Sequence, residues 1–518
     1  MKYYCLIIIT VLLQSSTVFA QPSANNFNKV WVTGEGISFT TTFTSTGPVN
    51  NYLDTFYSPY FAFSNSNICD SMGNLLLCSD GYQVYDKHVN VIDGGDTLVG
   101  TALFNNQQGW SVLSQNSIFL PIGDNRYYFI TPAASDSEVT ANWNPNSTRV
   151  IFDQLLYNMI DMKANNGAGK VTRRMVHLLD HVTLSKTQMM AVKHSDGKSW
   201  WLLKQASDTN MVYKFLFTQD SVYGPTVQGF AEPHFGIFDQ SGQSMFSQDG
   251  TQYATTCRGA KKIFVADFDR CFGNLINPRV YDVPAIPDVF DSTQRDLTQG
   301  LAFSPNGRFL YVCGFGNIQQ IDLQDPNPAN SWVKVAGADT ALNAFQMYSS
   351  MYLGPDNKLY IGNWSGLQSE MSVINSPDNK GTACNFCPKC LRFPKFHFTP
   401  TIIGGGASTP PCMPNYRLGI SSNHCWPADV PGVTALPKED FKLYPNPATS
   451  SITVEYSHSG GQLQITDVMG RVIQTTDLLK GTTKQSINIT TLPTGLYYYR
   501  HIADGALLHS GKLMIQSN

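Results

Sequence analysis

The stretch Leu301-Ala302-Phe303-Ser304-Pro305-Asn306-Gly307-Arg308-Phe309-Leu310-Tyr311-Val312 decides the fold. Two short apolar runs lie on either side of a polar segment that contains Asn306-Gly307. Short apolar runs are typical of buried strands, and Asn-Gly tolerates the positive φ angles of a tight hairpin turn. We therefore predict a β-hairpin over residues 301–312.

The same pattern recurs from about residue 45 to residue 375. In each copy, a turn rich in Gly, Asn or Asp comes directly before an aromatic or aliphatic strand. The other five turns are Met72-Gly73-Asn74, Gly123-Asp124-Asn125, Asp196-Gly197, Asp249-Gly250 and Asp356-Asn357. Helical periodicity is scarce, and we interpret residues 155–160 as part of a long strand because they lie between two hairpins.

Repeats of roughly 40–50 residues with several short strands each are typical of propeller blades. Divided by roughly 55 residues per blade, residues 21–430 predict an all-β propeller of about seven blades, with six or eight as alternatives. Blade sheets pack on their neighbours, so the many aromatic residues are expected at the interfaces between blades and do not by themselves indicate a ligand.

Residues 301–312 resemble the blade motif of WD-like and YVTN-type β-propellers. Four further segments, taken together, resemble a group of exported bacterial propellers that carry a sorting tail. They are Gly73-Asn74-Leu75-Leu76-Leu77, Trp200-Trp201-Leu202-Leu203, Phe268-Asp269-Arg270-Cys271 and Pro414-Asn415-Tyr416-Arg417-Leu418-Gly419. This resemblance covers roughly residues 50–425 and implies a fold but no activity.

Composition excludes several classes of protein. Of the 518 residues 14% are charged, and the formal net charge is −3. A nucleic-acid-binding protein would need a basic surface, so we expect no nucleic acid partner. No stretch of the mature chain approaches the roughly 18 consecutive apolar residues of a spanning helix, so we expect no transmembrane segment.

The first 20 residues have the features of a secretory signal peptide. Lys2 precedes an apolar run from Cys5 to Leu13, and the small-residue pattern Val18-Phe19-Ala20 follows. We expect cleavage before Gln21 and export of the remainder.

Ten cysteines remain after removal of Cys5 from the eleven in the chain. Disulfides are the expected state in an oxidising compartment. The short-range pairs that we predict are Cys69 with Cys78, Cys257 with Cys271, and Cys412 with Cys425. The run Cys384-x-x-Cys387-x-x-Cys390 is also typical of zinc or iron–sulfur ligation, but for an exported chain we favour disulfides and expect no metal or cofactor.

The sequence changes character after residue 430. Residues 431–440 are interpreted as a linker. Beyond them apolar residues alternate, as in Ile452, Val454 and Tyr456, with turn residues between the runs. This pattern predicts a small antiparallel, Ig-like β-sandwich over residues 441–518. An adhesion or spacer module of the same shape is the alternative interpretation.

Residues 441–518 resemble the C-terminal sorting domain of the type IX secretion system. Four ordered motifs carry the resemblance, and their marker residues are Tyr444, Pro445, Asn446, Pro447, Asp467, Gly470, Arg471, Leu492, Pro493, Gly495, Tyr497, Gly511 and Lys512. The resemblance implies export through the periplasm to the outer surface or beyond, with the secretion machinery and its sorting protease as partners. We also expect that a β-branched residue at Gly495 blocks export if this glycine has a positive φ.

Candidate catalytic and metal-binding groups are few. Ser195-Asp196-Gly197-Lys198-Ser199-Trp200 resembles the Asp-box of sialidase-type propellers, which is a structural turn. His177 and His181 have the spacing of a zinc site but lack the accompanying Glu. The pairs Asp93 with Asp96 and Asp267 with Asp269 are calcium candidates that fall short of the six oxygens usually required, so solvated turns are favoured. We assign no catalytic and no metal-binding residue.

Three functions fit these observations. We favour a non-enzymatic exported propeller whose loops bind a surface macromolecule or glycan, because stacked blades hold many variable loops on one rigid face. A secreted hydrolase or lyase acting on glycan or peptide, with its groups around the central channel, is the second hypothesis. A structural surface component is the third.

Overall fold

The computed structural model describes residues 26–516 except 35–36, 55–58, 62–63, 110, 112, 144–149, 208, 233–241, 259, 285–298, 315, 338–347, 364–369, 395–408, 421–440, 457–459, 468–471 and 504–505. The predicted signal peptide and the predicted linker 431–440 lie outside the described residues. The chain divides into two compact units, residues 1–213 with 227–420 and residues 214–226 with 421–518.

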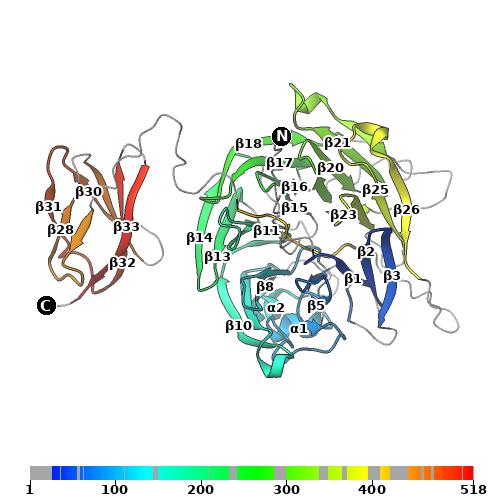
Figure 1. The fold of residues 1–518 in the computed structure, drawn as a ribbon, viewed down its shortest axis with the longest axis horizontal. Coiled ribbons are helices and arrows are strands. Elements are labelled where there is room, and N and C mark those ends of the chain that lie inside the picture. The colour runs from blue at the N-terminus through cyan, green and yellow to red at the C-terminus, as the bar shows by residue number, and fades with distance from the viewer. Residues whose placement is uncertain are drawn as a thin grey trace, which may run out of the picture. The chain divides into compact units, whose positions relative to one another are not determined.

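Seven antiparallel sheets form the propeller, and they follow one another around a ring (Figure 1). The first sheet contains β1 (Val30–Gly34), β2 (Ser38–Thr44) and β3 (Gly47–Asp54), and the second contains β4 (Ser66–Cys69), β5 (Leu75–Ser79) and β6 (Val84–Asp86). The third contains β7 (Ile118–Pro121), β8 (Arg126–Ala133), β9 (Gln154–Asp161) and β10 (Lys170–Leu179). The fourth contains β11 (Leu184–Lys193), β12 (Trp200–Ala206), β13 (Met211–Phe217) and β14 (Val222–Gly229).

The remaining three sheets repeat the four-stranded plan. The fifth contains β15 (Ser244–Phe246), β16 (Gln252–Cys257), β17 (Lys262–Asp269) and β18 (Asn274–Asp282). The sixth contains β19 (Gly300–Phe303), β20 (Phe309–Gly314), β21 (Asn317–Asp322) and β22 (Val333–Ala336), and the seventh contains β23 (Tyr348–Leu353), β24 (Leu359–Asn363), β25 (Glu370–Ile374) and β26 (Phe386–Arg392). We call these sheets blades 1 to 7. The prediction of about seven blades is confirmed.

Each blade is a meander of strands that are consecutive in the chain, so neighbouring strands pair antiparallel. The first strands of successive blades contact one another in the series β11, β15, β19 and β23, and β4 contacts both β1 and β7. The first strand of each blade therefore lines the centre of the ring. Residues 155–160, which were interpreted as a strand, lie within β9 as expected.

All six predicted turns occupy the same place in their blades, between the first and the second strand of blades 2 to 7. The turn residues Gly73, Gly197, Gly250, Gly307 and Asn357 have φ angles between 60° and 89°. Only Gly adopts such angles without steric cost, and Asn tolerates them better than other residues. The periodic sequence signal is therefore one backbone requirement repeated six times.

Aromatic side chains join the two ends of the ring, as predicted for blade interfaces. The ring of Trp31 in blade 1 packs edge-on against Tyr360 of blade 7 with centroids 5.2 Å apart, and Phe43 packs against the same tyrosine at 5.5 Å. Asn50 Nδ2 also donates to the carbonyl oxygen of Arg392 at 2.7 Å. No sheet in the described part of the chain mixes strands from both ends, so side chains make this junction.

Helices are short and peripheral. The α-helices are α1 (Thr101–Asn106) and α2 (Asp136–Asn142), and the 3₁₀ segments include η1 (Asn165–Gly167), η2 (Pro328–Asn330) and η4 (Gly381–Cys384). Ser135 caps α2 by accepting a hydrogen bond from the backbone of Glu138. The fold is therefore all-β in its framework, as predicted.

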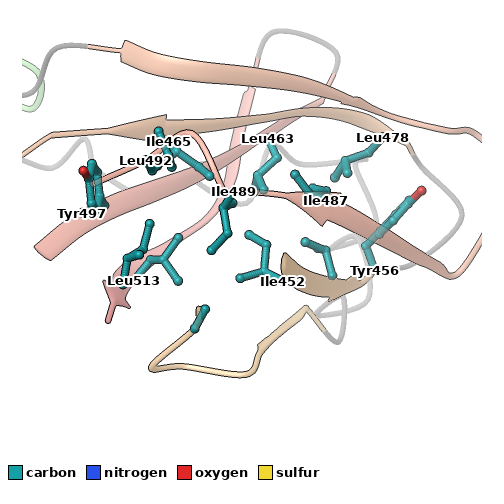
Figure 2. Close-up of a cluster of buried hydrophobic side chains, with 13 residues drawn as sticks. Ile452, Tyr456, Leu463, Ile465, Leu478, Ile487, Ile489, Leu492, Tyr497 and Leu513 are labelled. Atoms are coloured by element: carbon teal, nitrogen blue, oxygen red, sulfur yellow. The ribbon is translucent and has the colours of Figure 1, made fainter. Parts of the chain in front are cut away.

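The C-terminal segment forms a small β-sandwich. One sheet contains β27 (Lys442–Tyr444), β28 (Ser451–Glu455) and β31 (Lys484–Asn488), in that order. The other has the order β30 (Val472–Leu478), β29 (Gly461–Thr466), β32 (Gly495–Ala503) and β33 (Ala506–Ile515). Ile452, Val454, Leu463 and Ile465, which alternate in the sequence, lie in its buried core (Figure 2).

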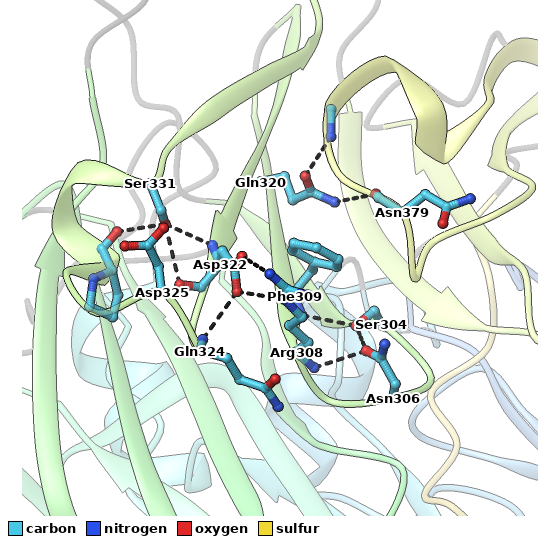
Figure 3. Close-up of polar contacts among 12 residues, drawn as sticks. Ser304, Asn306, Arg308, Phe309, Gln320, Asp322, Gln324, Asp325, Ser331 and Asn379 are labelled. Carbon is cyan, nitrogen blue, oxygen red and sulfur yellow. Dashed lines mark hydrogen bonds and ion pairs between the residues drawn. The ribbon is translucent and has the colours of Figure 1, made fainter.

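A polar network connects the first turn of blade 6 to the end of β21 (Figure 3). Arg308 donates from Nε and Nη2 to the two carboxylate oxygens of Asp322 at 2.9 and 2.7 Å. The Asp322 side chain is 1% exposed, and the hydrogen bonds from Arg308 are the largest of the effects that lower its pKa below the ordinary 3.8. The pair joins the start of β20 to the end of β21, because the ladder partner of Asp322 is Phe309, the residue that follows Arg308.

We predict that Arg308→Met lowers the melting temperature at pH 7, because it leaves the buried Asp322 carboxylate without its partner. A carboxyl group whose pKa is lowered on folding adds stability above its unfolded pKa and loses it as the pH falls below that value. The difference from the parent protein should therefore shrink below pH 3.8. Calorimetry from pH 3 to pH 8 measures this effect.

The control is Lys163→Met, which removes an exposed ion pair with Asp124 at 3.9 Å. Exposed pairs at this distance contribute little. If the two variants melted alike at pH 7, the assigned role of Arg308 would be wrong.

Candidate functional site

The first sorting motif ties the two ends of the C-terminal sandwich together. Tyr444, Pro445, Asn446 and Pro447 lie at and after the end of β27. The Asn446 side chain donates to the carbonyl of Lys512 at 2.6 Å and accepts from the amide of Met514 at 2.8 Å. These are the bonds a neighbouring strand would make, so Asn446 substitutes for a strand at the edge of β33.

The later motif residues form the turn into β32 and its packing. Leu492 and Tyr497 are buried in the sandwich core, and the Tyr497 hydroxyl donates to the carbonyl of Pro493 at 2.9 Å. Asp467 follows β29, whereas Gly470 and Arg471 lie outside the described residues. Lys512 is exposed on β33.

The motif glycines Gly495 and Gly511 differ in whether the surrounding structure leaves room for a side chain. Gly495 does not have a positive φ, and a Cβ atom there would meet only the Tyr497 ring at 3.7 Å, so the condition behind our expectation for this residue is not met. A Cβ at Gly511 would lie 2.6 Å from the Tyr499 hydroxyl oxygen, on the residue directly opposite in β32. Gly511 is therefore the glycine that the packing requires.

The centre of the propeller is filled by its own chain. Residues 409–420, which we call the plug, belong to no strand and follow the seventh blade. Asn65 of blade 2 holds the first part, because its Nδ2 donates to the carbonyl of Thr409 at 3.0 Å and its carbonyl accepts from the amide of Cys412 at 2.7 Å. Thr409 and Cys412 are 2% and 3% exposed, so this part is buried.

The second part of the plug bonds to three other blades. The Tyr416 hydroxyl donates to the carbonyl of Phe119 in blade 3 at 3.0 Å, and its ring is 1% exposed. Asn415 Nδ2 donates to the carbonyl of Gln248 in blade 5 at 2.6 Å. Arg417 Nη2 donates to the carbonyl of Pro355 in blade 7 at 2.6 Å. The resemblance motif at residues 414–419 is thus the outer half of the plug.

Three prolines allow the plug to be buried. Pro410, Pro411 and Pro414 have no backbone N–H, so they bring no donor that would need a partner inside the ring. A cavity of about 70 Å³ remains beside the plug. Arg417 is the sole charged residue among those that line it, and its described walls include no Asp, Glu, His, Cys, Ser or Lys.

Lys204 is buried next to the plug. Its side chain is 0% exposed on β12, and Nζ donates to the carbonyl of Thr187. Burial lowers the pKa of Lys204 to about 7, and the nearby Cys412 thiol opposes this slightly. Burial also raises the pKa of the Cys412 thiol to about 12. Both groups are therefore almost fully enclosed by protein, with Lys204 0% and Cys412 3% exposed.

The Asp-box-like segment is a structural turn, as interpreted from the sequence. Asp196 accepts hydrogen bonds from the amides of Lys198 and Ser199 at 2.7 and 2.8 Å. Trp200 is fully buried, and its Nε1 donates to the carbonyl of Pro121 at 2.8 Å. Asp249 in the equivalent turn of blade 5 is bonded in the same way, to the amide of Thr251 at 3.0 Å.

Three of the other acidic candidates are paired with cations, whereas Asp269 accepts a hydrogen bond from the amide of Cys271 at 2.8 Å. Asp93 lies 2.8 Å from Lys170, and Asp96 lies 3.4 Å from Arg174. Asp267 accepts from Arg279 at 2.5 Å. These carboxylates join neighbouring segments of the sheets, which accounts for them without calcium.

The two histidines lie on and just beyond β10. His177 Nδ1 and His181 Nε2 are each 3.6 Å from the Asp180 carboxylate, and Asp180 also accepts from Gln154 Nε2 at 3.0 Å. Within the described ranges no group of three or more His, Cys, Asp or Glu residues is placed to hold a metal ion.

The cysteines differ from the predicted pairing. Cys69 and Cys78 are separate buried thiols. They lie in neighbouring strands but not opposite each other, because Cys69 pairs with Leu75 and Cys78 with Asn67. The Cys69 thiol donates to the carbonyl of Val30 at 3.7 Å, and Cys78 donates to that of Asp86 at 3.8 Å, so the two sulfurs point to different partners.

Cys257 and Cys271 are at opposite ends of a strand. Cys257 pairs with Lys262 at the start of β17, whereas Cys271 follows Asp269 at its end. At about 3.3 Å per residue, β17 keeps these cysteines far beyond disulfide distance. Cys271 is disulfide-bonded elsewhere.

The other cysteine predictions have mixed outcomes. Cys412 is a buried thiol, and Cys425 lies outside the described residues. Cys387 and Cys390 form a disulfide along β26 with Cα atoms 5.7 Å apart, while Cys384 is a buried thiol. Disulfide formation in the Cys-x-x-Cys-x-x-Cys run agrees with the interpretation favoured from the sequence.

A surface groove of about 390 Å³ lies between blades 2 and 3, on the side of the predicted turns. Phe27, Leu76, Pro121 and Met162 supply apolar walls. Its polar residues come from the first turns of the two blades and are Asp70, Ser71, Asp124, Asn125 and Arg126. We call it the blade 2–3 groove. Both turns are predicted from the sequence, but their proximity across the groove is seen only in the structure.

Comparison with known proteins identifies the C-terminal sandwich. Residues 442–516 match the family described as the secretion system C-terminal sorting domain. This match agrees with the four motifs and with the sandwich that positions them. The segment is the sorting domain of the type IX secretion system, and it indicates export to the cell surface or the extracellular space.

Solved structures similar to the chain include propeller proteins, at low identity. The periplasmic gluconolactonase of Pseudomonas aeruginosa is 10% identical with a TM-score of 0.39, and the match covers 73% of this chain and 97% of that one. AztD of Citrobacter koseri is 13% identical with a TM-score of 0.35, over 70% and 87% of the two chains. The β-propeller domain of Cps50 from Myceliophteria thermophila is 10% identical with a TM-score of 0.35, over 65% and 92%. No curated protein sequence matches the chain.

Fold and tail together define the class, which is that of exported β-propeller proteins. More particularly, this chain is a seven-bladed propeller that carries a type IX sorting domain at residues 442–516. None of the helices in the described residues has the length and apolar character needed to cross a membrane.

We predict that Gly511→Val abolishes export, because its side chain would displace Tyr499 from the partner strand and unfold the sandwich. Gly495→Val is the matched control and should be exported normally, since a Cβ there meets nothing closer than 3.7 Å. Immunoblots of periplasmic and extracellular fractions measure both. Normal export of the Gly511 variant would show that this packing does not matter.

We predict that Lys204→Met stabilises the protein at pH 7. A lysine whose pKa falls on folding makes the native state less stable below its unfolded pKa, so stability rises between pH 7 and pH 10.5 and is level below pH 7. Methionine removes this dependence and adds on the order of a few kcal/mol at pH 7. Urea unfolding at several pH values measures it.

The control for this pH profile is Lys198→Met, which alters an exposed lysine in the turn of the same blade. It should keep the rise in stability above pH 7. An unchanged pH profile in the Lys204 variant would contradict the assignment.

Proposed function

We propose that this protein is a non-catalytic binding protein of the cell surface or extracellular space, and that its ligand is a glycan bound on the turn face of the propeller. The filled channel is the observation that carries the proposal. A hydrolase centred on the channel needs ionisable groups in contact with substrate. The lining of the remaining cavity includes Tyr352 and Arg417, whose guanidinium is already bonded to Pro355, but no carboxylate, imidazole or thiol.

The blade 2–3 groove supports a ligand of mixed polarity. Its volume of about 390 Å³ falls within the roughly 300–1,000 Å³ of small-molecule sites. Apolar walls suit the C–H faces of a sugar ring, and Ser71, Asn125 and Arg126 offer hydrogen bonds to its hydroxyls.

Charge in the groove favours a neutral saccharide. Both Asp70 carboxylate oxygens accept hydrogen bonds within their own turn, from Met72, Asn74 N and Asn74 Nδ2 at 2.9 to 3.0 Å. Asp124 lies 3.9 Å from Lys163. The Asp70 carboxylate is thus committed to its own turn. The groove combines Asp70 and Asp124 with Arg126, so it has no cluster of one sign that would select a strongly charged ligand.

The test is to incubate the secreted protein with glycan and peptide libraries and to measure both binding and turnover. Saturable glycan binding without turnover is expected. Arg126→Met should weaken it by about ten-fold, the effect of losing one hydrogen bond to a charged group. Arg173→Met, on the same blade but outside the groove, is the matched control.

Other outcomes decide between the remaining hypotheses. Turnover of a glycan or peptide would support the hydrolase. Peptide binding alone would overturn the glycan assignment, and no binding at all would favour the structural component.

A further inference from the structure

The plug is attached to the ring in the way a bound peptide is attached to its receptor. None of its residues enters a strand ladder. Its polar bonds to the ring are dispersed over blades 2, 3, 5 and 7, and most of them run from a side chain to a main-chain carbonyl. Docking of a proline-rich segment against aromatic side chains, without addition of a strand, is a recurring mode of peptide recognition, and Phe27 and Trp200 pack on Tyr416 here.

The turns of two blades are shaped around the plug. A Cβ atom at Gly197 would lie 2.8 Å from the amide nitrogen of Ile420, and one at Gly250 would lie 2.9 Å from Leu418 Cδ1. The equivalent Gly307 of blade 6 has nearly the same φ, 71° against 69° for Gly197, but its nearest neighbour is Gln252 Nε2 at 3.3 Å. Gly197 thus has a steric role toward the plug that Gly307 lacks.

An arginine from the ring holds the outer end. Arg270 Nη2 donates to the carbonyl of Gly419 at 2.8 Å, and the same guanidinium is fixed by Nε, which donates to the carbonyl of Lys193 at 2.9 Å. Beyond this point the plug becomes exposed, because the Ile420 side chain is 73% accessible. The buried contacts with the ring therefore end near Gly419.

We infer that the central channel is a binding site for an extended, proline-rich peptide, and that residues 409–420 are its resident ligand, which can leave the channel as a unit while the blades stay folded. The ladders of the blades do not include the plug, so its departure breaks the main-chain bond between Cys412 and Asn65 and the side-chain contacts described above, but no strand pairing. Segments held in this way open locally, at lower free energy than the sheets around them.

Thiol labelling tests the inference in the full-length protein. Cys412 is buried in the plug, whereas Cys69 and Cys313 are buried within the sheets of blades 2 and 6. Under native conditions, local release exposes Cys412 alone, and global unfolding exposes all three. Labelling with iodoacetamide followed by mass spectrometry of each peptide separates the two cases.

Gly197→Ala and Gly307→Ala are compared because both introduce the same backbone strain. Gly197→Ala should increase the labelling rate of Cys412 by at least about ten-fold over Gly307→Ala, with Cys69 and Cys313 unaffected. A synthetic peptide of residues 409–420 with Cys412→Ser, added in excess, should increase Cys412 labelling further because it occupies the vacated channel.

Two results would overturn the inference: labelling of Cys412 only together with Cys69 and Cys313, or no effect of the added peptide on Cys412. If Gly197→Ala does not fold, Tyr416→Phe provides the same test, since it removes the bond to Phe119 without adding an atom.

Discussion

The structure of this propeller depends on pairing the main-chain polar groups at its centre. A segment that crosses a dry channel without joining a sheet must satisfy each N–H and C=O by other means. Three prolines reduce the number of donors, the main chain of Asn65 pairs with the Cys412 amide, and the side chains of Asn65 and Arg270 pair with the carbonyls of Thr409 and Gly419. A segment without strand pairing can then occupy the centre of the ring with few unpaired main-chain groups.

The turns have two roles that are visible only in three dimensions. A positive φ at Gly197 and Gly250 closes the first hairpin of blades 4 and 5, and the missing Cβ also leaves room for the plug. The turns of blades 2 and 3 border a groove instead. The same type of turn therefore packs against the plug in blades 4 and 5 and borders an open groove in blades 2 and 3.

What could be predicted from the sequence was local or periodic. The six turns, the strand alternation of the sandwich and the Asp196 turn each follow from a few adjacent residues. The plug could not be found in this way, because Tyr416 bonds to a residue 297 positions earlier in the chain. In the sequence, the plug can be recognised only as an apolar, proline-rich segment that lacks the alternation of a strand. The predicted pairing of Cys257 with Cys271 does not agree with the structure for a related reason, since these residues are close in sequence but β17 separates them.

The buried thiols of Cys69, Cys78, Cys313 and Cys412 have a consequence for a protein that travels through an oxidising space. Burial raises the pKa of each, so thiolate, the reactive form, is scarce in the folded chain. An unfolded chain has no such protection and can form mismatched crosslinks. A molecule that folds before it is oxidised therefore keeps sulfhydryls that oxidants can no longer reach.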